Sequence, residues 1–227
     1  MPTSNPRLDG RVSSYLHAVL SKDRGSAHAL VQKLVDEGEP LSKIYETLGA
    51  AQVEVGLLWE KGVITVSDEH FATGVTLECV SMAAERLKKF RRETAGFVVL
   101  CPVEGEFHNV GLRMMSELLR QDGWETELRD SGPPLSVIKE VKDRKRVDLF
   151  CFSATMPASV PRVAEAIRAV RDEPAFRSAK ILVGGPAIAS ERVRKELGGP
   201  GQADCVALSL PQAVEFVGSF VPRPATP

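Results

Sequence analysis

The chain has 227 residues, of which 43% are hydrophobic and 26% are charged, and 29 Lys and Arg stand against 30 Asp and Glu. This length suits one large domain or two ordinary ones, and the balanced charge argues against direct nucleic-acid binding, which calls for a basic face. No run reaches membrane-spanning length and the stretch MPTSNPRLDG is no signal segment, so we expect a cytoplasmic protein that contacts no membrane.

Up to about residue 92, the apolar residues recur at the spacing of amphipathic helices. Breakers at Gly25, at 38–40 and at Gly62 separate the helical stretches. The apolar stripes are Leu16, Val19 and Leu20; Leu30, Val31, Leu34 and Val35; Leu41, Ile44, Leu48, Ala51, Val55 and Leu58; and Phe71, Val75, Cys79, Met82 and Phe90. Short connections predict an antiparallel four-helix bundle over residues 1–92. The basic stretch RLKKFRRETAG predicts a solvated helix end and a hinge near 91–96.

From residue 96 onward, strand-like and helix-like stretches alternate. The expected strands are 96–103, 124–130, 147–153, 180–186 and 203–209, and the expected helices are 109–121, 135–144, 158–172, 189–197 and 211–220. Several strands are apolar throughout, which predicts a parallel sheet covered on both faces. The predicted fold class is α+α/β: a four-helix bundle, then a Rossmann-like (flavodoxin-like) five-stranded parallel sheet with flanking helices over residues 96–222. The proline-rich residues 223–227 predict a disordered tail.

The stretch VEGEFHNVG, residues 103–111, places His108 in the loop after the first expected strand. Glu106 precedes this histidine and Gly111 follows it. A carboxylate that holds one ring nitrogen while the other nitrogen faces outward is typical of a metal-ligating imidazole. The alternative is a histidine that only fills space. Parallel sheets bind their ligands at the carboxyl ends of the strands, where His108 is expected to lie, and this position favours His108 as a metal ligand.

Two further loops end at the same predicted edge of the sheet. The third expected strand runs into SATMP, which places the hydroxyls of Ser153 and Thr155 there. The fourth runs into GGP, which places Gly184 and Gly185 where no side chain can block a ligand. Taken singly, the serine is typical of a cap and the glycine pair of a turn. Together with the His108 loop, they indicate a binding site.

Other cofactor and redox signatures are missing from the sequence. There is no Gly-x-Gly-x-x-Gly after the first strand, no Walker glycine loop and no nucleophile elbow. The four cysteines lie far apart in apolar runs, without a Cys-x-x-Cys pair: Cys79, Cys101, Cys151 and Cys205. We expect them to be reduced core residues rather than disulfides or zinc ligands.

The three loops E-F-H-N-V-G, S-A-T and G-G resemble the cobalamin-binding domain of the methionine synthase and mutase type. The resemblance extends to the preceding four-helix bundle, which is the family's usual cap over the corrin. It implies that His108 replaces the cofactor's dimethylbenzimidazole as the lower cobalt ligand. It also implies that the displaced nucleotide tail passes Ser153, Thr155, Gly184 and Gly185. Glu106 stands where the family has Asp, and its extra methylene predicts a looser contact or one through water.

The bundle carries a second motif, WEKGVITVSDEH, residues 59–70. Its Trp59 and its Glu69-His70 pair resemble the signature of light-sensing, adenosylcobalamin-dependent regulators. The resemblance implies that Trp59 packs over the upper ligand and that Glu69 and His70 contact the adenosyl group. The alternative is a core tryptophan followed by an acidic helix start.

This second resemblance has departures. Glu60 occupies the position where many of these photoreceptors have a histidine that captures cobalt after illumination, so we expect water or His70 in that role. The DNA-binding module of those regulators is not found in this sequence. A related subgroup, the photocobilins, also holds biliverdin, and any bilin here would be bound non-covalently because no cysteine is suitably placed.

The predicted function is that of a cobalamin-binding light sensor without catalytic turnover. Light would break the cobalt–carbon bond beneath Trp59, and the loss of adenosyl contacts would shift the bundle or the oligomer. The implied partners are other copies of the chain, in a light-dependent homo-oligomer, and a protein partner or output domain. One alternative is a corrinoid carrier for methyl transfer, and another is a cobalamin-responsive antirepressor without photochemistry.

Overall fold

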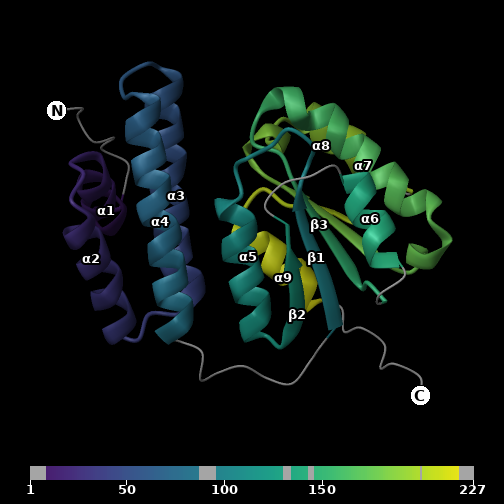
Figure 1. Ribbon diagram of the computed structural model, residues 1–227, viewed down its shortest axis with the longest axis horizontal. Helices are drawn as coiled ribbons and strands as arrows, with labels where there is room; N and C mark the ends of the chain where they lie inside the picture. The colour runs from purple at the N-terminus through teal and green to yellow at the C-terminus, as the bar shows by residue number, and fades with distance from the viewer. Residues whose placement is uncertain (1–8, 87–95, 130–133, 143–145, 200, 220–227) are drawn as a thin grey trace. The chain divides into compact units, whose positions relative to one another are not determined.

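The computed structural model describes residues 9–86, 96–129, 134–142, 146–199 and 201–219. The chain divides into two compact units, Met1–Phe90 and Arg91–Pro227. The first unit is helical and the second contains the sheet (Figure 1). The expected hinge, the helical position of Phe90 and the predicted disordered tail lie outside the described residues.

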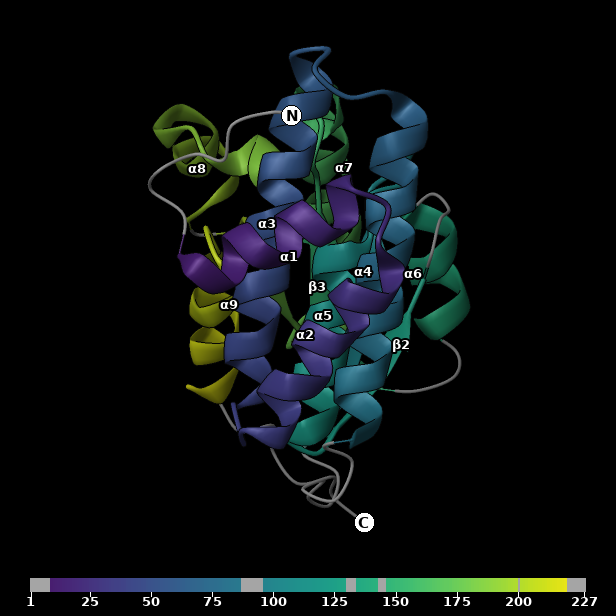
Figure 2. The same ribbon diagram turned by 90° about the vertical axis from the view of Figure 1, so that its left-hand side faces the viewer.

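The helical unit contains four helices within the residues that are described. They are α1 (Gly10–Leu20), α2 (Arg24–Asp36), α3 (Leu41–Glu60) and α4 (Val66–Arg86). The two long helices α3 and α4 lie side by side, and α1 lies across α3 rather than along it (Figure 2). The predicted stripes supply the core, in which Leu16, Ile44 and Val75 are buried. The four helices expected ahead of the sheet are therefore confirmed.

The start of α4 is set by a reciprocal cap. The Thr65 hydroxyl accepts a hydrogen bond from the Asp68 backbone N–H at 3.2 Å. The Asp68 carboxylate in turn accepts from the Thr65 backbone N–H at 2.9 Å. This exchange satisfies donors that a helix start leaves unpaired. It places Glu69 and His70 in the first two turns of α4.

The second unit is a five-stranded parallel sheet in the order β2-β1-β3-β4-β5. The strands are β1 (Gly96–Pro102), β2 (Trp124–Leu128), β3 (Leu149–Ser153), β4 (Lys180–Gly184) and β5 (Cys205–Val206). The helices are α5 (Val110–Gln121), α6 (Pro134–Lys142), α7 (Val160–Asp172), α8 (Glu191–Leu197) and α9 (Leu210–Gly218). Short 3₁₀ turns are η2 (Pro157–Ser159), η3 (Pro174–Phe176) and η4 (Pro186–Ile188). The flavodoxin-like prediction is confirmed, because this strand order is the flavodoxin order.

Side chains along each strand point alternately to the two faces of the sheet, and each face has its own hydrophobic core. From β1, Val99 and Cys101 enter the core that α6, α7 and α8 cover. Val98 and Leu100 from the same strand enter the core that α5 and α9 cover. Both faces are therefore buried, which explains why the central strands are apolar throughout.

All five strands are shorter than their predicted ranges, and β5 is shortened the most. β4 ends at Gly184 because Gly185 has φ 108°, which interrupts the extended backbone. β5 covers only Cys205–Val206 and pairs with β4 alone at the edge of the sheet. Cys205 is partly exposed there, so the core prediction holds for the other three cysteines and not for this one. None of the described helices is both long and apolar enough to cross a membrane.

Candidate functional site

The loops singled out from the sequence meet at the carboxyl edge of the sheet. β1 lies between β2 and β3, so the chain leaves β1 in one direction and β3 in the other. At this switch point, the carboxyl ends of neighbouring strands leave a crevice in which parallel folds bind ligands. The loop with Glu106 and His108 follows β1, and the loop with Thr155 follows β3. Topology thus brings these two loops together.

Glu106 joins the two loops through a fully bonded carboxylate. Its Oε1 accepts hydrogen bonds from Nδ1 and from the backbone N–H of His108, the latter at 3.3 Å. Its Oε2 accepts from the backbone N–H groups of Thr155 at 2.8 Å and Met156 at 3.0 Å, and from the Ser159 hydroxyl at 3.3 Å. The expected loose or water-bridged contact is therefore wrong, since glutamate reaches the imidazole directly. The extra methylene lets one side chain span both loops.

The bonding also determines the chemical state of the acid and of the imidazole. Burial would raise the pKa of Glu106, but hydrogen bonds from His108, Met156 and Thr155 outweigh burial and lower the pKa to about 2. An ionised carboxylate can only accept, so Nδ1 of His108 carries the proton and the ring lone pair is on Nε2. The Glu106 side chain is 1% exposed, whereas that of His108 is 44% exposed. This is a held imidazole whose ring reaches the surface.

Ser153 gives a second sign that the edge binds something. Its Oγ is buried and has no hydrogen-bond partner among the described residues. Buried hydroxyls normally have a hydrogen-bond partner, so an unpaired hydroxyl at the end of a strand indicates that a polar group of a ligand binds there. Thr155 is held at the same edge through its backbone N–H, which donates to Glu106.

The glycines at the edge have unlike roles. A Cβ at Gly185 would lie 2.2 Å from the Ala154 carbonyl oxygen, so this glycine is required by close backbone packing. A Cβ at Gly184 would meet only the Ala207 oxygen, at 3.9 Å. A Cβ at Gly111, in the first turn of α5, would meet nothing within 4 Å. The Ala154 backbone therefore excludes a side chain at Gly185, whereas Gly184 has space for a small one, and the ligand path beside these two glycines stays a prediction.

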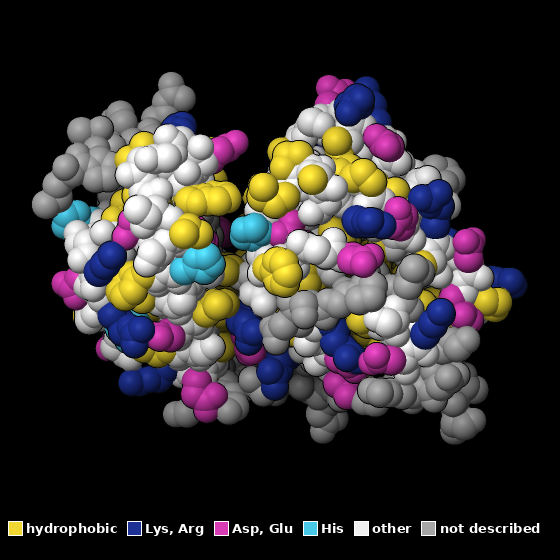
Figure 3. Space-filling model, turned by 45° about the horizontal axis from the view of Figure 1, so that its top comes forward, with side chains coloured by type: hydrophobic (Ala, Val, Ile, Leu, Met, Phe, Trp, Pro, Cys, Tyr) yellow, Lys and Arg dark blue, Asp and Glu magenta, His cyan; other side chains and the backbone are white. Residues whose placement is uncertain are grey.

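Exposed large apolar side chains are concentrated in a few places. Hydrophobic side chains gather at the surface of each unit (Figure 3). In the sheet unit, those that are described belong to loops after β1, β3 and β5: Phe107, Met156 and Leu208. In the helical unit, they lie along α3 and around the α3–α4 connection: Val53, Leu57, Trp59, Val63 and Val66. Apolar surface of this kind marks ligand or partner contacts when it is contiguous.

The remaining predicted site residues belong to the helical unit. Trp59, at the end of α3, is 38% exposed, so it is not the core tryptophan of the alternative interpretation. Glu69 Oε2 lies 3.6 Å from His70 Nδ1. His70 Nδ1 also lies 2.7 Å from the Val66 carbonyl, to which it donates because a carbonyl can only accept. The structure brings Glu69 and His70 together within their own unit.

Several residues that contact the predicted site residues were not expected from the sequence. Ser159 and the backbone of Met156 bind Glu106, and in the helical unit the Thr73 hydroxyl donates to Glu69 and lies 3.4 Å from Gln52 Oε1. Met156 and Ser159 lie 50 and 53 positions from Glu106, so no spacing rule connects them, whereas Thr73 follows Glu69 by one helical turn. The exposed Phe107 could have been suspected, because a large apolar residue inside a polar loop is unusual.

Comparison with known proteins relates this chain to proteins that bind corrinoids. A family model described as a B12 binding domain matches residues 96–215, and another with the same description matches residues 12–83. Dimethylamine corrinoid protein 1 of Methanosarcina acetivorans is 28% identical over 204 residues, covering 87% of this chain and 91% of that protein. Its counterpart from Methanosarcina mazei is 28% identical over 205 residues, covering 87% and 89%.

The fold has a solved counterpart as well. The structure of the Methanosarcina barkeri monomethylamine corrinoid protein aligns with a TM-score of 0.74 at 21% identity and covers 89% of this chain and 94% of that one. These relatives are named as corrinoid proteins, and the light-sensing subgroup stays a prediction. The family model that matches residues 96–215 covers more than half of this chain, and the chain therefore belongs to the B12-binding domain family.

Proposed function

We propose that the protein is a corrinoid carrier for methyl transfer, in which His108 supplies the lower cobalt ligand. The observation that carries the proposal is the imidazole held by Glu106 beside the orphan Ser153 hydroxyl, at the switch point of the sheet. When bound, the cobalt of the corrinoid would supply the atom that carries the methyl group. Neutral imidazole is a suitable donor for cobalt, and a carboxylate on its other nitrogen raises its basicity.

The chain's own residues have separable tasks in this proposal. Glu106 orients the His108 ring and keeps its proton on Nδ1. Ser153 offers a hydroxyl to the nucleotide tail, and Gly184 leaves space beside it. Phe107, Met156 and Leu208 give an apolar surface for the macrocycle. The relatives named as dimethylamine corrinoid proteins support a methyl group as the cargo and a methyltransferase as the partner.

The second candidate is an adenosylcobalamin light sensor, which the exposed Trp59 at the end of α3 and the Glu69-His70 pair in the first two turns of α4 favour. A large flat apolar ring and two hydrogen-bond acceptors suit a nucleoside better than a methyl group. The bilin, the homo-oligomer and its light dependence stay predictions of that resemblance. The antirepressor alternative shares the same binding residues and differs in its output alone.

The lower-ligand assignment is tested by exchanging single histidines. His108→Ala protein loaded with hydroxocobalamin should lose the absorption bands of an imidazole-ligated corrinoid and should release the cofactor more readily on gel filtration. His17→Ala, which removes an exposed histidine on α1, is the matched control and should behave as wild type. An unchanged spectrum together with unchanged retention in His108→Ala would contradict the assignment.

A second experiment separates carrier from sensor. The protein is loaded with methylcobalamin or adenosylcobalamin, and spectra and elution volume are recorded in the dark and after green light. A carrier should retain the methyl form and transfer its methyl group when a methyltransferase is supplied, with no change of elution volume. A sensor should prefer the adenosyl form and change its elution volume after illumination.

A further inference from the structure

The backbone of residues 153–156, which begins at the end of β3, is bonded to the loop after β1. The Ser153 carbonyl accepts a hydrogen bond from the Val103 N–H at 3.2 Å, and the Val103 carbonyl accepts from the Glu106 N–H at 3.0 Å. Two N–H groups of the same segment donate to the Glu106 carboxylate, which holds His108. The loop that carries the imidazole is therefore fixed to residues 153–156 both at its start and at its carboxylate.

On its other side, this segment is bonded to the loop after β4. The Ala154 N–H donates to the Gly184 carbonyl at 3.1 Å, and the Ala154 carbonyl accepts from the Ala187 N–H of η4 at 3.1 Å. Between these two bonds, Gly185 lies so close that a Cβ there would be 2.2 Å from the Ala154 oxygen. Closely packed groups transmit strain to one another, so a shift of the loop after β4 must also move Ala154.

Residues 153–156 thus connect two positions of the proposed site. The first position is the Ser153 hydroxyl, which is buried and has no hydrogen-bond partner among the described residues. Ser153 lies beside Gly184, its register partner on β4, where a small side chain would have space. The second position is the ring of His108, which Glu106 holds. A group that binds at the first position therefore bonds to the same segment that supports the carboxylate at the second.

We propose that residues 153–156 and the turn η4 are positioning elements for His108, so that binding beside Ser153 and Gly184 and ligation by His108 strengthen each other. The inference rests on the proposed corrinoid-binding function. A ligand group that bonds the Ser153 hydroxyl selects the ordered arrangement of the segment, and in that arrangement Glu106 holds the ring. Coupling between two positions is reciprocal, so ligation by His108 also favours binding at the first position.

The first test removes one bond on the β4 side and measures the consequence on the β1 side, in cofactor-free protein. Ala187→Pro lacks the N–H that bonds the Ala154 carbonyl. Hydrogen exchange at the two N–H groups that donate to Glu106 should quicken about fivefold, the equivalent of one hydrogen bond. Ala175→Pro is the matched control, because Ala175 has the same place in η3 and its N–H bonds the Glu173 carboxylate. Equal exchange in the two variants would overturn the inference.

Cobinamide, a corrinoid without the nucleotide tail, shows whether the coupling reaches the cobalt ligand. It has no tail to fill the space beside Gly184, so its binding reports on His108 alone. Ala187→Pro should bind cobinamide about fivefold more weakly and shift the absorption bands of the imidazole-ligated corrinoid. Ala187→Ser keeps the N–H and should match wild type, with Tm measured for both variants. Weaker binding of cobalamin alone, with cobinamide unchanged, would overturn the inference, because η4 would then contact only the tail.

Wild-type protein gives a further measurement that does not require a variant to fold. The N–H groups of Ala154, Thr155 and Ala187 should be protected from exchange to a similar degree, because coupled loops open together. An Ala187 N–H that exchanges freely while the Thr155 N–H stays protected would overturn the inference and leave the proposed function standing. Wild-type protein that binds neither cobalamin nor cobinamide would overturn the proposed function, and with it the inference.

Discussion

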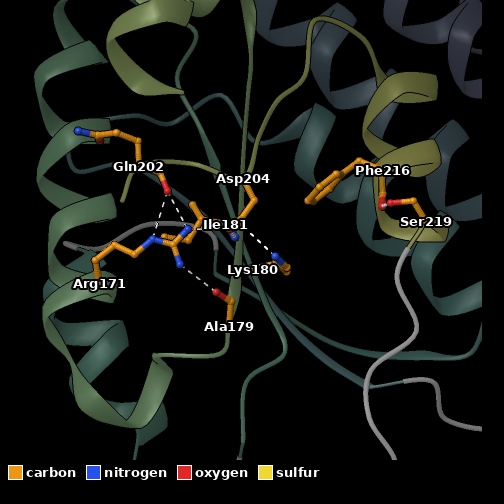
Figure 4. A network of polar contacts seen from close by, with 8 residues as sticks. All are labelled: Arg171, Ala179, Lys180, Ile181, Gln202, Asp204, Phe216 and Ser219. Atoms are coloured by element: carbon orange, nitrogen blue, oxygen red, sulfur yellow. Dashed lines mark hydrogen bonds and ion pairs between the residues drawn. The ribbon is translucent and has the colours of Figure 1, made fainter. Parts of the chain in front are cut away.

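The two edges of the sheet each hold a well-bonded carboxylate, with different partners. At the amino edge, Asp204 pairs with Arg171 at 2.6 Å and with Lys180 at 3.0 Å, and it accepts from the Ile181 backbone N–H (Figure 4). Arg171 also donates to the carbonyls of Gln202 and Ala179. At the carboxyl edge, Glu106 collects backbone N–H groups, a hydroxyl and an imidazole.

The comparison separates an acid that is paired with cations from an acid that is bonded to an imidazole. Two cations of the protein, Arg171 and Lys180, neutralise the charge of Asp204, so this carboxylate needs no ligand to pair with. Among its described contacts, Glu106 has an imidazole as its only side-chain nitrogen partner, and that ring reaches the surface. A buried carboxylate that accepts a hydrogen bond from a half-exposed imidazole sets the tautomer and the orientation of that ring, and it also links the two loops. The two edges can therefore be distinguished by mutation.

The largest effect should come from Gly185→Val at the carboxyl edge. The new Cβ would lie 2.2 Å from the Ala154 oxygen, at φ 108°, so the backbone of both loops must move. We expect a loss of about 3 kcal/mol or more in the free energy of unfolding, measured by urea denaturation. Gly184→Ala, whose Cβ meets an atom only at 3.9 Å, is the control and should change stability little. Equal stability of the two variants would contradict the packing argument.

The second-largest loss of stability should come from Glu106→Gln. The amide would turn a donor toward the backbone N–H groups of Thr155 and Met156, or toward the His108 ring, and leave buried donors unpaired. We expect a loss of about 2–3 kcal/mol in unfolding free energy. Glu106→Asp is the informative companion, since it keeps the charge but is too short to span both loops, and should cost less. If Glu106→Gln were as stable as wild type, the carboxylate would not be the link between the loops.

Asp204→Asn at the amino edge should cost less, about 1–2 kcal/mol, because its side chain is 22% exposed and solvent screens the ion pairs. Burial would raise the pKa of Asp204, but Arg171, Lys180 and the Ile181 N–H lower it overall. A folded-state pKa below the unfolded value, about 3.9, means that the stabilisation is present above that pH and is lost as pH falls through the folded pKa. Urea midpoints between pH 7 and pH 3 should therefore fall less steeply in Asp204→Asn. Parallel curves would contradict this assignment.

The smallest effect on stability should come from Gly111→Ala. Its Cβ would meet no atom within 4 Å, and alanine favours a helix over glycine, so a gain of about 0.5 kcal/mol is expected. Thermal unfolding of the cofactor-free protein checks this value. Weaker cobalamin retention in the same variant would show that the ligand needs a glycine here, whereas unchanged retention would contradict a binding role for Gly111.

The sequence alone determined the classes of structure and the general position of the site. Helical and strand periodicities depend on local geometry, so the bundle helices and the alternating sheet unit could be predicted from apolar spacing. Placing His108, Ser153 and the glycine pair at one edge needed only the rule that parallel strands end together. The resemblance to cobalamin-binding domains rests on those same loops, and the family is now shown by the match to residues 96–215.

Only the tertiary structure decided which partner each group has. It showed that Glu106 spans two loops, that Gly185 is fixed by the Ala154 backbone and that Thr73 holds Glu69. It also showed that Trp59 is exposed rather than part of the core. Such facts depend on distances between residues far apart in the chain, and side-chain reach and backbone packing set these distances after the strands have paired. Periodicity reports which face a residue occupies, but not the atom that it meets there.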